Sequence, residues 1–310
     1  MINIKENIPL SDLTTFHLGG PARFFIEVKD KNELEEALQL AKKKKINWFI
    51  LGGGSNLLIS DQGFDGLVIK INNREVKIEE SKISAGAGLF LSEAVSSARR
   101  NNLSGLEWAI GIPGTVGGAI FGNAGAYGST TGDNISKVEI LDVTQEKFLW
   151  KDCSAGDCQF NYRTSIFKQK KEWIIFSAVF SLAPGNSEEI GAKMKKIIKE
   201  RSGKLPQGSS AGSFFKNPIV KEPKVLAEFE KDQGIKSRNG KIPAGWLIDQ
   251  LDLRGKKIGG AMVSQEHSNF IINTRKATAE DVIILASLIK QKVRNRFGVQ
   301  LEEEVQFLGF

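Results

Sequence analysis

Eighteen residues, GIPGTVGGAIFGNAGAYG from Gly111 to Gly128, carry no charge and contain seven glycines among small apolar side chains. A flexible linker is Gly/Ser-rich and polar, and this stretch is neither. It spells GxxxG twice, as packed membrane helices do, but Pro113 and Asn123 interrupt it. Its apolar part is therefore shorter than the roughly 20 residues that cross a bilayer. What remains is backbone that comes very close to other backbone or to a bound ligand.

A second glycine stretch, LGGGSNLL from Leu51 to Leu58, follows a predicted strand. It is not a P-loop, because no Lys-Ser/Thr follows the last glycine, and it is not GxGxxG, because Leu57 takes the sixth position. Three glycines with Ser55 and Asn56 can present several backbone N–H groups to a pyrophosphate. A tight structural turn explains this stretch alone equally well.

The two stretches together favour a flavin dinucleotide. One stretch can cradle a diphosphate, and the other can let a flat ring system lie against backbone, because glycine has no side chain to fill that space. A large planar cofactor with a diphosphate needs both features.

The length and composition set bounds on the class of protein. With 310 residues, 41% of them hydrophobic, the chain is long enough for two or three domains with real cores. The opening MINIKENIPL has no apolar segment of a signal peptide, so we expect a cytoplasmic location. Two cysteines, Cys153 and Cys158, and two isolated histidines, His17 and His267, suit neither a disulfide framework nor a metal site.

The net charge of +7 raises the possibility of a nucleic-acid binder. However, the basic residues are dispersed, and the densest run, Lys42–Lys45, ends a predicted helix where cations are favourable. No zinc-finger, RNP or helix-turn-helix pattern accompanies them. We therefore expect small anionic ligands rather than nucleic acid, and no membrane partner.

Short strands alternate with helical patterns along the chain. A strand over 23–28 precedes a helix over 32–45, for which Asn32 is the predicted N-cap. Further strands are expected over 67–71, 75–80, 82–88, 137–143 and 172–180. The expected helices cover 91–101, 187–201 (capped by Asn186) and 244–251, and a last one begins with the capping box Thr278–Asp281 and stops at Gly298. The chain is predicted to end in a strand. These elements predict an α+β fold with mixed sheets.

Several motifs, in order along essentially the whole chain, closely resemble one family. They are TTFHLGGPA, ILGGGSNLLISDQGFDGLVI, GLEWAIGIPGTVGGAIFGNAGAYG, FNYRTSIF, SSAGSFFKNP and AGWLIDQ. The family is the UDP-N-acetylenolpyruvoylglucosamine reductases, flavoenzymes that make UDP-N-acetylmuramate for peptidoglycan. A single glycine motif would also resemble the wider vanillyl-alcohol oxidase type of flavin-binding protein, whereas SAGSFFKNP and the C-terminal LEEEV are more specific.

The resemblance implies a three-domain flavoprotein. Its expected parts are FAD-binding subdomain 1 over 1–74, FAD-binding subdomain 2 over 75–203, to which strand 299–310 returns, and a substrate-binding domain over 204–298. No tyrosine lies between Arg163 and Lys204, so the chain resembles the shorter branch, which lacks a Tyr-bearing loop. We expect a monomer.

The resemblance also implies the ligands and the residues that bind them. FAD is the bound cofactor, NADPH the co-substrate, and UDP-N-acetylglucosamine enolpyruvate the substrate. Lys204 and Asn217 correspond to positions that hold the UDP-sugar. The cofactor-binding residues implied are Gly52, Gly53, Gly54, Ser55, Asn56, Leu57, Gly114, Thr115, Gly117, Gly118, Asn123 and Ala124.

Three residues correspond to the family's catalytic positions. Ser213 matches the proton donor, and Arg163 and Glu304 match the residues that stabilise the enol intermediate. These residue types suit the reduction of an enolpyruvyl ether, because hydride at C3 moves charge toward the carboxylate and C2 then needs a nearby hydroxyl. Taken singly, each has an ordinary structural explanation, and Glu302 or Glu303 remains an alternative to Glu304.

Two other function classes stay open at this stage. One is a different FAD enzyme of the same flavin-binding type, such as an oxidase that passes electrons to oxygen. The other is a colourless nucleotide or RNA binder, whose affinity would fall steeply with salt.

Overall fold

The structure, a computed structural model, describes residues 2–203 and 206–310. The chain divides into two compact units. Unit 1 comprises Met1–Ile8, Ala22–Gly53 and Asp65–Gly203, and unit 2 comprises Pro9–Pro21, Gly54–Phe64 and Lys204–Phe310. Each unit has its own cluster of buried apolar side chains, and both combine helices with strands. The predicted α+β class with mixed sheets is confirmed.

Unit 1 contains a four-stranded sheet in the order β1 (Lys5–Pro9), β2 (Pro21–Val28), β5 (Phe64–Ile71) and β3 (Trp48–Leu51). Strands β3 and β5 run parallel. Helix α1 (Lys31–Lys44) connects β2 to β3 and buries Leu34, Ala37, Leu38 and Ala41, one face of an amphipathic helix.

The predicted N-cap of α1 is wrong. Asp30, not Asn32, has the extended backbone of a cap, and its carboxylate accepts the Glu33 N–H at 2.9 Å. The helix begins one residue earlier than expected, so Asn32 lies inside its first turn.

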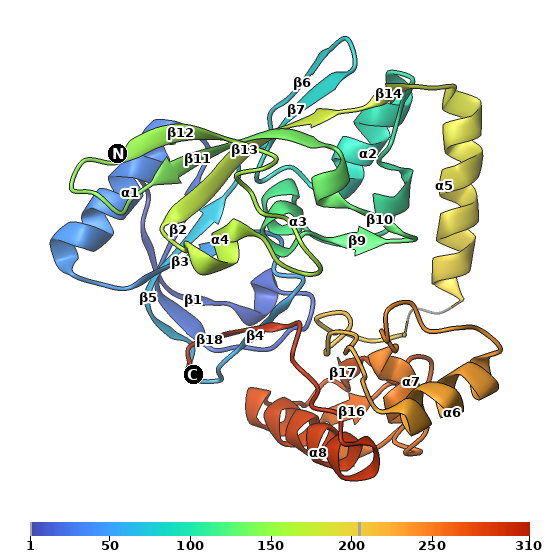
Figure 1. Cartoon of the computed structure of the whole chain (residues 1–310). Coiled ribbons are helices and arrows are strands. Elements are labelled where there is room, and N and C mark those ends of the chain that lie inside the picture. Colours follow the sequence, from blue (N-terminus) through green and yellow to red (C-terminus); the bar gives the residue numbers. More distant parts are fainter. Residues whose placement is uncertain (1, 204–205) are drawn as a thin grey trace. The chain divides into compact units, whose positions relative to one another are not determined.

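The larger sheet of unit 1 has five antiparallel strands in the order β12 (Leu149–Ser154), β11 (Ile135–Asp142), β13 (Trp173–Ser181), β7 (Lys82–Gly86) and β6 (Val76–Glu79) (Figure 1). Here β11 and β13 bury apolar side chains in the core of the unit, including the consecutive Ile174, Ile175 and Phe176 of β13. The predicted strands over 75–80, 82–88, 137–143 and 172–180 are thus confirmed.

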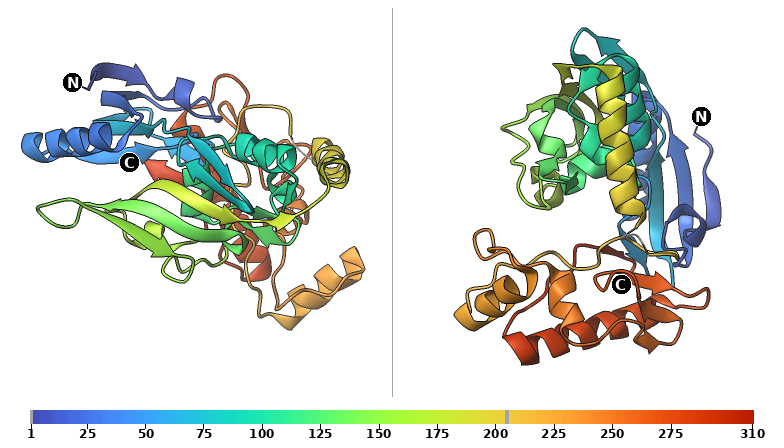
Figure 2. Two further views of the ribbon diagram at one scale, coloured as in Figure 1. Left: turned by 90° about the horizontal axis from the view of Figure 1, so that it is seen from above. Right: turned by 90° about the vertical axis from the view of Figure 1, so that its right-hand side faces the viewer.

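Helices cover part of unit 1 and frame its glycine stretch. They are α2 (Leu91–Arg100), α3 (Val116–Gly122), α4 (Ile166–Gln169) and α5 (Ser187–Ser202), with short turns η2 (Glu107–Ala109) and η3 (Thr131–Asp133). The Asn186 cap of α5 is confirmed. Helix α5 lies beside α2, as Figure 2 shows, and Arg99 of α2 donates to the Ser187 carbonyl at 3.2 Å. Two small pairs complete the unit: β8 (Leu103–Ser104) with β14 (Ala183–Pro184), and β9 (Gly125–Ala126) with β10 (Ser129–Thr130).

Unit 2 is built around α8 (Ala279–Phe297), which has the predicted Thr278–Asp281 capping box and ends at Gly298 with φ +66°. Its other elements are η1 (Ser11–Leu13), α6 (Pro223–Gln233), α7 (Ala244–Asp249), the sheet β15 (Lys257–Ile258), β16 (Ala261–Val263) and β17 (Ile271–Asn273), and the parallel pair β4 (Leu57–Ile59) and β18 (Gln306–Leu308). Helix α6 is not predicted from the sequence, because no side chain caps it; Pro223 at its first position is the start signal that was overlooked.

The C-terminal strand does not join the 75–203 sheet as expected. Instead β18 pairs with β4, where Gln306 N–H donates to the Asn56 carbonyl and Ser60 N–H donates to the Leu308 carbonyl. The strand has only three residues. The glutamates before it bond instead to another segment of unit 2: the Glu302 carbonyl accepts the Lys216 N–H, and the Glu304 N–H donates to the Phe214 carbonyl. The three-part division with boundaries at 74 and 203 stays a prediction.

No helix in the described part of the chain has the length and apolar character that crossing a bilayer requires.

Asp142, at the end of β11, predicts an acid-sensitive step in the stability of the protein. Burial raises its pKa, but hydrogen bonds from Lys151 and Thr144 outweigh this and lower the pKa from 3.8 to about 2. Because the folded-state pKa is below the unfolded one, the stabilisation is complete above pH 4 and is lost as the pH falls toward 2.

We expect Asp142→Asn to lower the free energy of unfolding by about 2 kcal/mol at pH 7. The difference from wild type should vanish near pH 2 in urea denaturation curves. Asp152→Asn, which removes an exposed ion pair with Lys137, is the control and should change little. A constant difference across this pH range would contradict the assignment.

Candidate active site

The two glycine stretches pack backbone against backbone inside unit 1. A Cβ placed on Gly53 would lie 2.7 Å from the Gly114 Cα, and one on Gly52 would lie 2.8 Å from Thr115 Oγ1. Gly114 itself has φ +117°, a conformation that side chains rarely adopt. Close approach of backbone and a positive φ therefore account for Gly53 and Gly114, and the Thr115 side chain accounts for Gly52.

Helix α3, in the middle of the glycine stretch, presents a different surface. Buried Thr115 caps it by accepting the Gly118 N–H at 3.4 Å, and Gly117 N–H donates to the Ala87 carbonyl at 2.9 Å. A Cβ on Gly117 would lie 2.9 Å from the Ala87 Cβ, whereas one on Gly118 would meet only Thr115 Oγ1, at 3.6 Å. A Cβ on Gly122 would meet nothing within 4 Å. Protein packing therefore explains Gly117 but leaves the other two glycines unexplained.

This contrast gives a prediction. Gly118→Ala should leave the apoprotein as stable as wild type or up to about 1 kcal/mol more stable, because alanine favours helix. If a flavin lies against this backbone, the same change should lower the bound FAD, measured by absorbance after purification. Gly53→Ala should instead destabilise the fold, because its Cβ clashes with Gly114.

Gly156→Ala, whose Cβ would make only an ordinary 3.7 Å contact, is the matched control and should keep full flavin. Full flavin content in Gly118→Ala as well would refute the placement of the cofactor at α3.

The second half of the LGGGSNLL loop belongs to unit 2. A Cβ on Gly54, which has φ +63°, would lie 2.0 Å from the Leu13 carbonyl oxygen. Ser55 is partly exposed, and Leu57 is buried in β4. The Asn56 amide donates to the Glu304 carbonyl at 3.1 Å, so this side chain links the loop to the C-terminal segment.

Asn123 and Ala124 follow α3 and shape the turn that carries Arg163. Asn123 is buried in the left-handed conformation; its amide donates to the Asn161 carbonyl at 2.9 Å and its oxygen accepts the Gly132 N–H at 2.9 Å. The Ala124 carbonyl accepts both the N–H and the hydroxyl of Thr131. The side chain of Asn123 therefore joins the end of α3 to the backbone of Asn161 and Gly132.

Arg163 sits in this turn with φ +55°. Its guanidinium donates to the Gly125 carbonyl at 3.1 Å and lies 5.6 Å from the centre of the Tyr162 ring. Lys168 donates to the Arg163 carbonyl at 2.8 Å. The side chain is partly buried and tied to the glycine stretch, so it is more than an exposed charge that lies over an aromatic ring.

Ser213 lies in unit 2 in an extended segment that runs between two others. It forms an antiparallel bridge with Phe270 on one side, and the following Phe215 forms one with Glu303 on the other. The Glu304 N–H donates to the Phe214 carbonyl at 2.8 Å. Ser213 and Glu304 therefore lie on adjacent segments of one small network.

The three consecutive glutamates have different surroundings. Glu302 pairs with Lys216 at 3.1 Å, and Glu303 pairs with Lys290 at 2.7 Å. The backbone of Glu304 is held on both sides, by the Phe214 carbonyl and by the Asn56 side chain. The side chains of Glu302 and Glu303 are thus each engaged by a lysine of unit 2.

Of the two residues expected to hold the UDP-sugar, Lys204 lies outside the described residues. Asn217 is in unit 2, where its side-chain oxygen accepts the Ala244 N–H at 3.0 Å at the start of α7.

The candidate residues divide between the two units. Unit 2 brings together Ser213, Glu304 and Asn56 in one hydrogen-bonded network and also contains Gly54, Ser55, Leu57 and Asn217. Unit 1 brings Arg163 together with the end of the glycine stretch and contains Gly52, Gly53, Gly114, Thr115, Gly117, Gly118, Asn123 and Ala124.

The two cysteines are buried in unit 1 and play no part in this network. Burial raises the pKa of Cys153, and burial together with Cys153 and Asp157 raises the pKa of Cys158 to about 12. Such thiols are protonated at neutral pH and unsuited to nucleophilic chemistry. In the segments that the structure describes, no cluster of His, Cys, Asp and Glu could hold a metal ion.

Two family models match the chain. One, described as an FAD binding domain, covers residues 22–149. The other, described as the C-terminal domain of UDP-N-acetylenolpyruvoylglucosamine reductase, covers residues 204–308. The first contains the glycine stretch and α3, and the second contains Ser213 and Glu304.

Full-length relatives agree with these matches. The UDP-N-acetylenolpyruvoylglucosamine reductase of Solibacter usitatus is 37% identical over 99% of this chain and 97% of its own length. That of Caldanaerobacter subterraneus subsp. tengcongensis is 41% identical over 98% of this chain and 93% of its own length. The crystal structure of UDP-N-acetylenolpyruvylglucosamine reductase from Thermus caldophilus superposes with a TM-score of 0.79 at 31% identity and covers all of both chains. The chain therefore belongs to the family of UDP-N-acetylenolpyruvoylglucosamine reductases, which are oxidoreductases.

Proposed function

We propose that this chain reduces the enolpyruvyl group of UDP-N-acetylglucosamine enolpyruvate to UDP-N-acetylmuramate, a precursor of peptidoglycan, with bound FAD and with NADPH as the reductant. The observation that carries the proposal is that Phe214, the residue after Ser213, accepts the Glu304 N–H in unit 2, on a chain related over its full length to named reductases. These are the residue types that a proton donor and a stabilising group require.

The residues of unit 1 fit a flavin at α3. A Cβ on Gly118 would make only an ordinary contact with Thr115 Oγ1, at 3.6 Å, and one on Gly122 would meet nothing within 4 Å, so both leave room for close approach of a ligand to backbone. We assign Gly114, Thr115, Gly117, Gly118, Asn123 and Ala124 to the flavin side and the loop Gly52–Leu57 to the diphosphate. FAD, when bound, supplies reversible transfer of a hydride between NADPH and the substrate.

The chain's own residues stabilise the negative charge that develops on the substrate and donate a proton to it. Reduction of the enolpyruvyl double bond adds hydride at C3 and a proton at C2, and negative charge builds up toward the carboxylate between the two additions. The Arg163 guanidinium is permanently charged and stabilises that negative charge electrostatically, with Glu304 as the second stabilising group. The Ser213 hydroxyl gives its proton to C2, which requires that water be excluded and that the hydroxyl be held close to the carbon. Lys204 and Asn217 hold the UDP-sugar.

A product assay tests the proposed function. The holoenzyme with NADPH and UDP-N-acetylglucosamine enolpyruvate should form one UDP-N-acetylmuramate, heavier than the substrate by two hydrogens, for each NADPH oxidised. Oxidation of NADPH that depends on oxygen and leaves the enolpyruvyl compound unchanged would instead identify an oxidase. Binding of RNA by a colourless protein would reject both flavin functions.

A further inference from the structure

Asn269, in unit 2, forms hydrogen bonds with the backbone directly after Ser213. Its side-chain oxygen accepts the Phe215 N–H at 3.0 Å, and its amide donates to the Phe215 carbonyl at 2.8 Å. The Asn269 carbonyl accepts the Phe214 N–H at 2.7 Å. Three hydrogen bonds from one residue therefore fix the three peptide units that follow the Ser213 Cα, and Asn269 is only 4% exposed.

The same short segment also holds Glu304. The Phe214 carbonyl accepts the Glu304 N–H at 2.8 Å, and the Lys216 N–H donates to the Glu302 carbonyl at 2.9 Å. The segment 213–216 thus lies between Asn269 on one side and 302–304 on the other. A displacement of this segment moves Ser213 and changes its position relative to Glu304.

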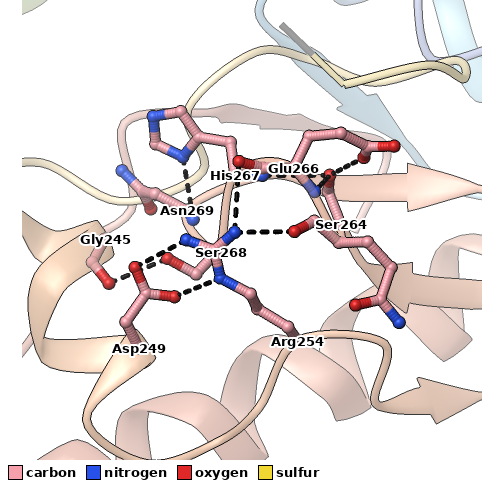
Figure 3. A network of polar contacts seen from close by, with 9 residues as sticks. Gly245, Asp249, Arg254, Ser264, Glu266, His267, Ser268 and Asn269 are labelled. Atoms are coloured by element: carbon pink, nitrogen blue, oxygen red, sulfur yellow. Dashed lines mark hydrogen bonds and ion pairs between the residues drawn. The ribbon is translucent and has the colours of Figure 1, made fainter. Parts of the chain in front are cut away.

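A brace of polar side chains keeps the loop that carries Asn269 in place (Figure 3). Arg254 donates to both oxygens of Asp249, at 2.6 and 2.9 Å, and to the Gln265 carbonyl at 2.6 Å. The Ser268 hydroxyl donates to the Gly245 carbonyl at 2.8 Å and is buried. The loop is thus bonded to α7 through Gly245 and to Arg254, which follows α7. These bonds hold Asn269 in place beside the 213–216 segment.

Ser264 closes the other end of the loop. Its hydroxyl accepts the N–H groups of Glu266 and His267 and donates to the Glu266 carboxylate at 2.6 Å. The Asn269 N–H donates to His267 Nδ1 at 3.2 Å. The loop is therefore held by side chains at several points along its length.

We propose that Asn269 is a positioning residue for the reductase chemistry: it sets the place of the Ser213 hydroxyl and, through Phe214, of Glu304. The inference rests on the proposed function of Ser213. The primary amide of asparagine suits this position, because its oxygen accepts the Phe215 N–H while its NH₂ donates to the Phe215 carbonyl. An aspartate of the same shape would set a buried carboxylate oxygen against the Phe215 carbonyl oxygen.

The three hydrogen bonds from Asn269 to Phe214 and Phe215, called the clamp below, can be tested without measuring catalysis. In Asn269→Asp, the amide hydrogens of Phe214 and Phe215 should exchange with solvent about three- to tenfold faster than in wild type, by mass-resolved hydrogen exchange. Exchange in β11 and β13 of unit 1 should not change. Unchanged exchange at Phe214 and Phe215 would overturn the clamp.

A kinetic experiment tests what the clamp does. In Asn269→Asp, reduction of the bound flavin by NADPH should proceed at the wild-type rate, whereas reoxidation by the enolpyruvyl substrate should slow by about 10–100-fold. The double variant Ser213→Ala/Asn269→Asp should be slower than Ser213→Ala by much less than the factor that Asn269→Asp costs alone, because Asn269 acts mainly through the serine and only in part through Glu304. Additive losses, or equal losses in both half-reactions, would show a general structural role and overturn the proposal.

Asn273→Asp is the matched control. Asn273 also donates to backbone carbonyls, those of Phe16 and His17, and accepts the N–H groups of Arg275 and Ala277, but it does not contact the 213–216 segment. It should cost stability and leave the reoxidation rate near wild type. Equal slowing in both asparagine variants would overturn the proposal.

Two further results separate the possible failures. If Ser213→Ala reoxidises at the wild-type rate, the proposed role of Ser213 is wrong and the positioning role falls with it. If Ser213→Ala is slow but Asn269→Asp is not, only the positioning role is wrong. Should Asn269→Asp fail to fold, Arg254→Lys loosens the brace from its partly exposed end and should produce the same selective slowing at smaller size.

Discussion

Ser213→Ala is expected to slow the reoxidation of the flavin by the enolpyruvyl substrate by about 10²–10⁴-fold, the range for loss of a positioned general acid. The change deletes the hydroxyl and little else, since the extended segment is held by backbone bonds of Phe214 and Phe215. Stability, flavin content and the rate of reduction by NADPH should therefore stay near wild type. Single-turnover stopped-flow spectra measure the two half-reactions separately.

Ser210→Ala is the matched control, because Ser210 lies in the same loop and its hydroxyl only accepts the Gly212 N–H at 3.4 Å. It should reoxidise normally. Ser213→Cys should recover part of the lost rate, since a thiol can donate a proton from nearly the same place. An alanine variant at Ser213 that reoxidises as fast as wild type would reject its role as proton donor.

Arg163→Lys is expected to produce the second large loss, about 10²-fold or more in reoxidation by the substrate. Lysine keeps the charge but not the planar fork that binds a carboxylate with two parallel hydrogen bonds. The positive φ of Arg163 is no harder for lysine than for arginine, so the turn should survive. The rate of reduction by NADPH should change little.

Arg23→Lys is the control for this substitution, because Arg23 forms an exposed ion pair with Asp65, at 3.1 Å, and, like Arg163, lies over a neighbouring aromatic ring, that of Phe24. It should behave as wild type in both half-reactions. A similar loss in both half-reactions of Arg163→Lys would point to damage to the turn, which also contacts the Gly125 carbonyl, and not to recognition of charge.

Periodicity and capping signals predicted the long elements well. The face of α8, its capping box and its glycine stop are all local signals, and so is the Asn186 cap of α5. Asp30 was missed because Asp30 and Asn32, two residues apart, can both cap, and only the backbone of the folded chain distinguishes them. The partner of β18 was missed because pairing between distant segments leaves no local pattern.

The glycines show how far the sequence could predict the candidate site. Their density indicated close backbone approach, but not whether the neighbour is protein or ligand. The structure separates Gly53 and Gly114, which pack against each other, from Gly118, which has room beside it. Asn269 gave no signal in the sequence at all, because its importance arises from hydrogen bonds to a segment more than fifty residues away.

The most direct test of the proposed function follows the flavin spectrum without oxygen. We expect NADPH to bleach the visible absorbance of the holoenzyme, and we expect the bleached state to persist until UDP-N-acetylglucosamine enolpyruvate is added, when the oxidised spectrum returns. If the spectrum stays bleached after that addition and returns only when air is admitted, the chain is not a reductase of the enolpyruvyl group.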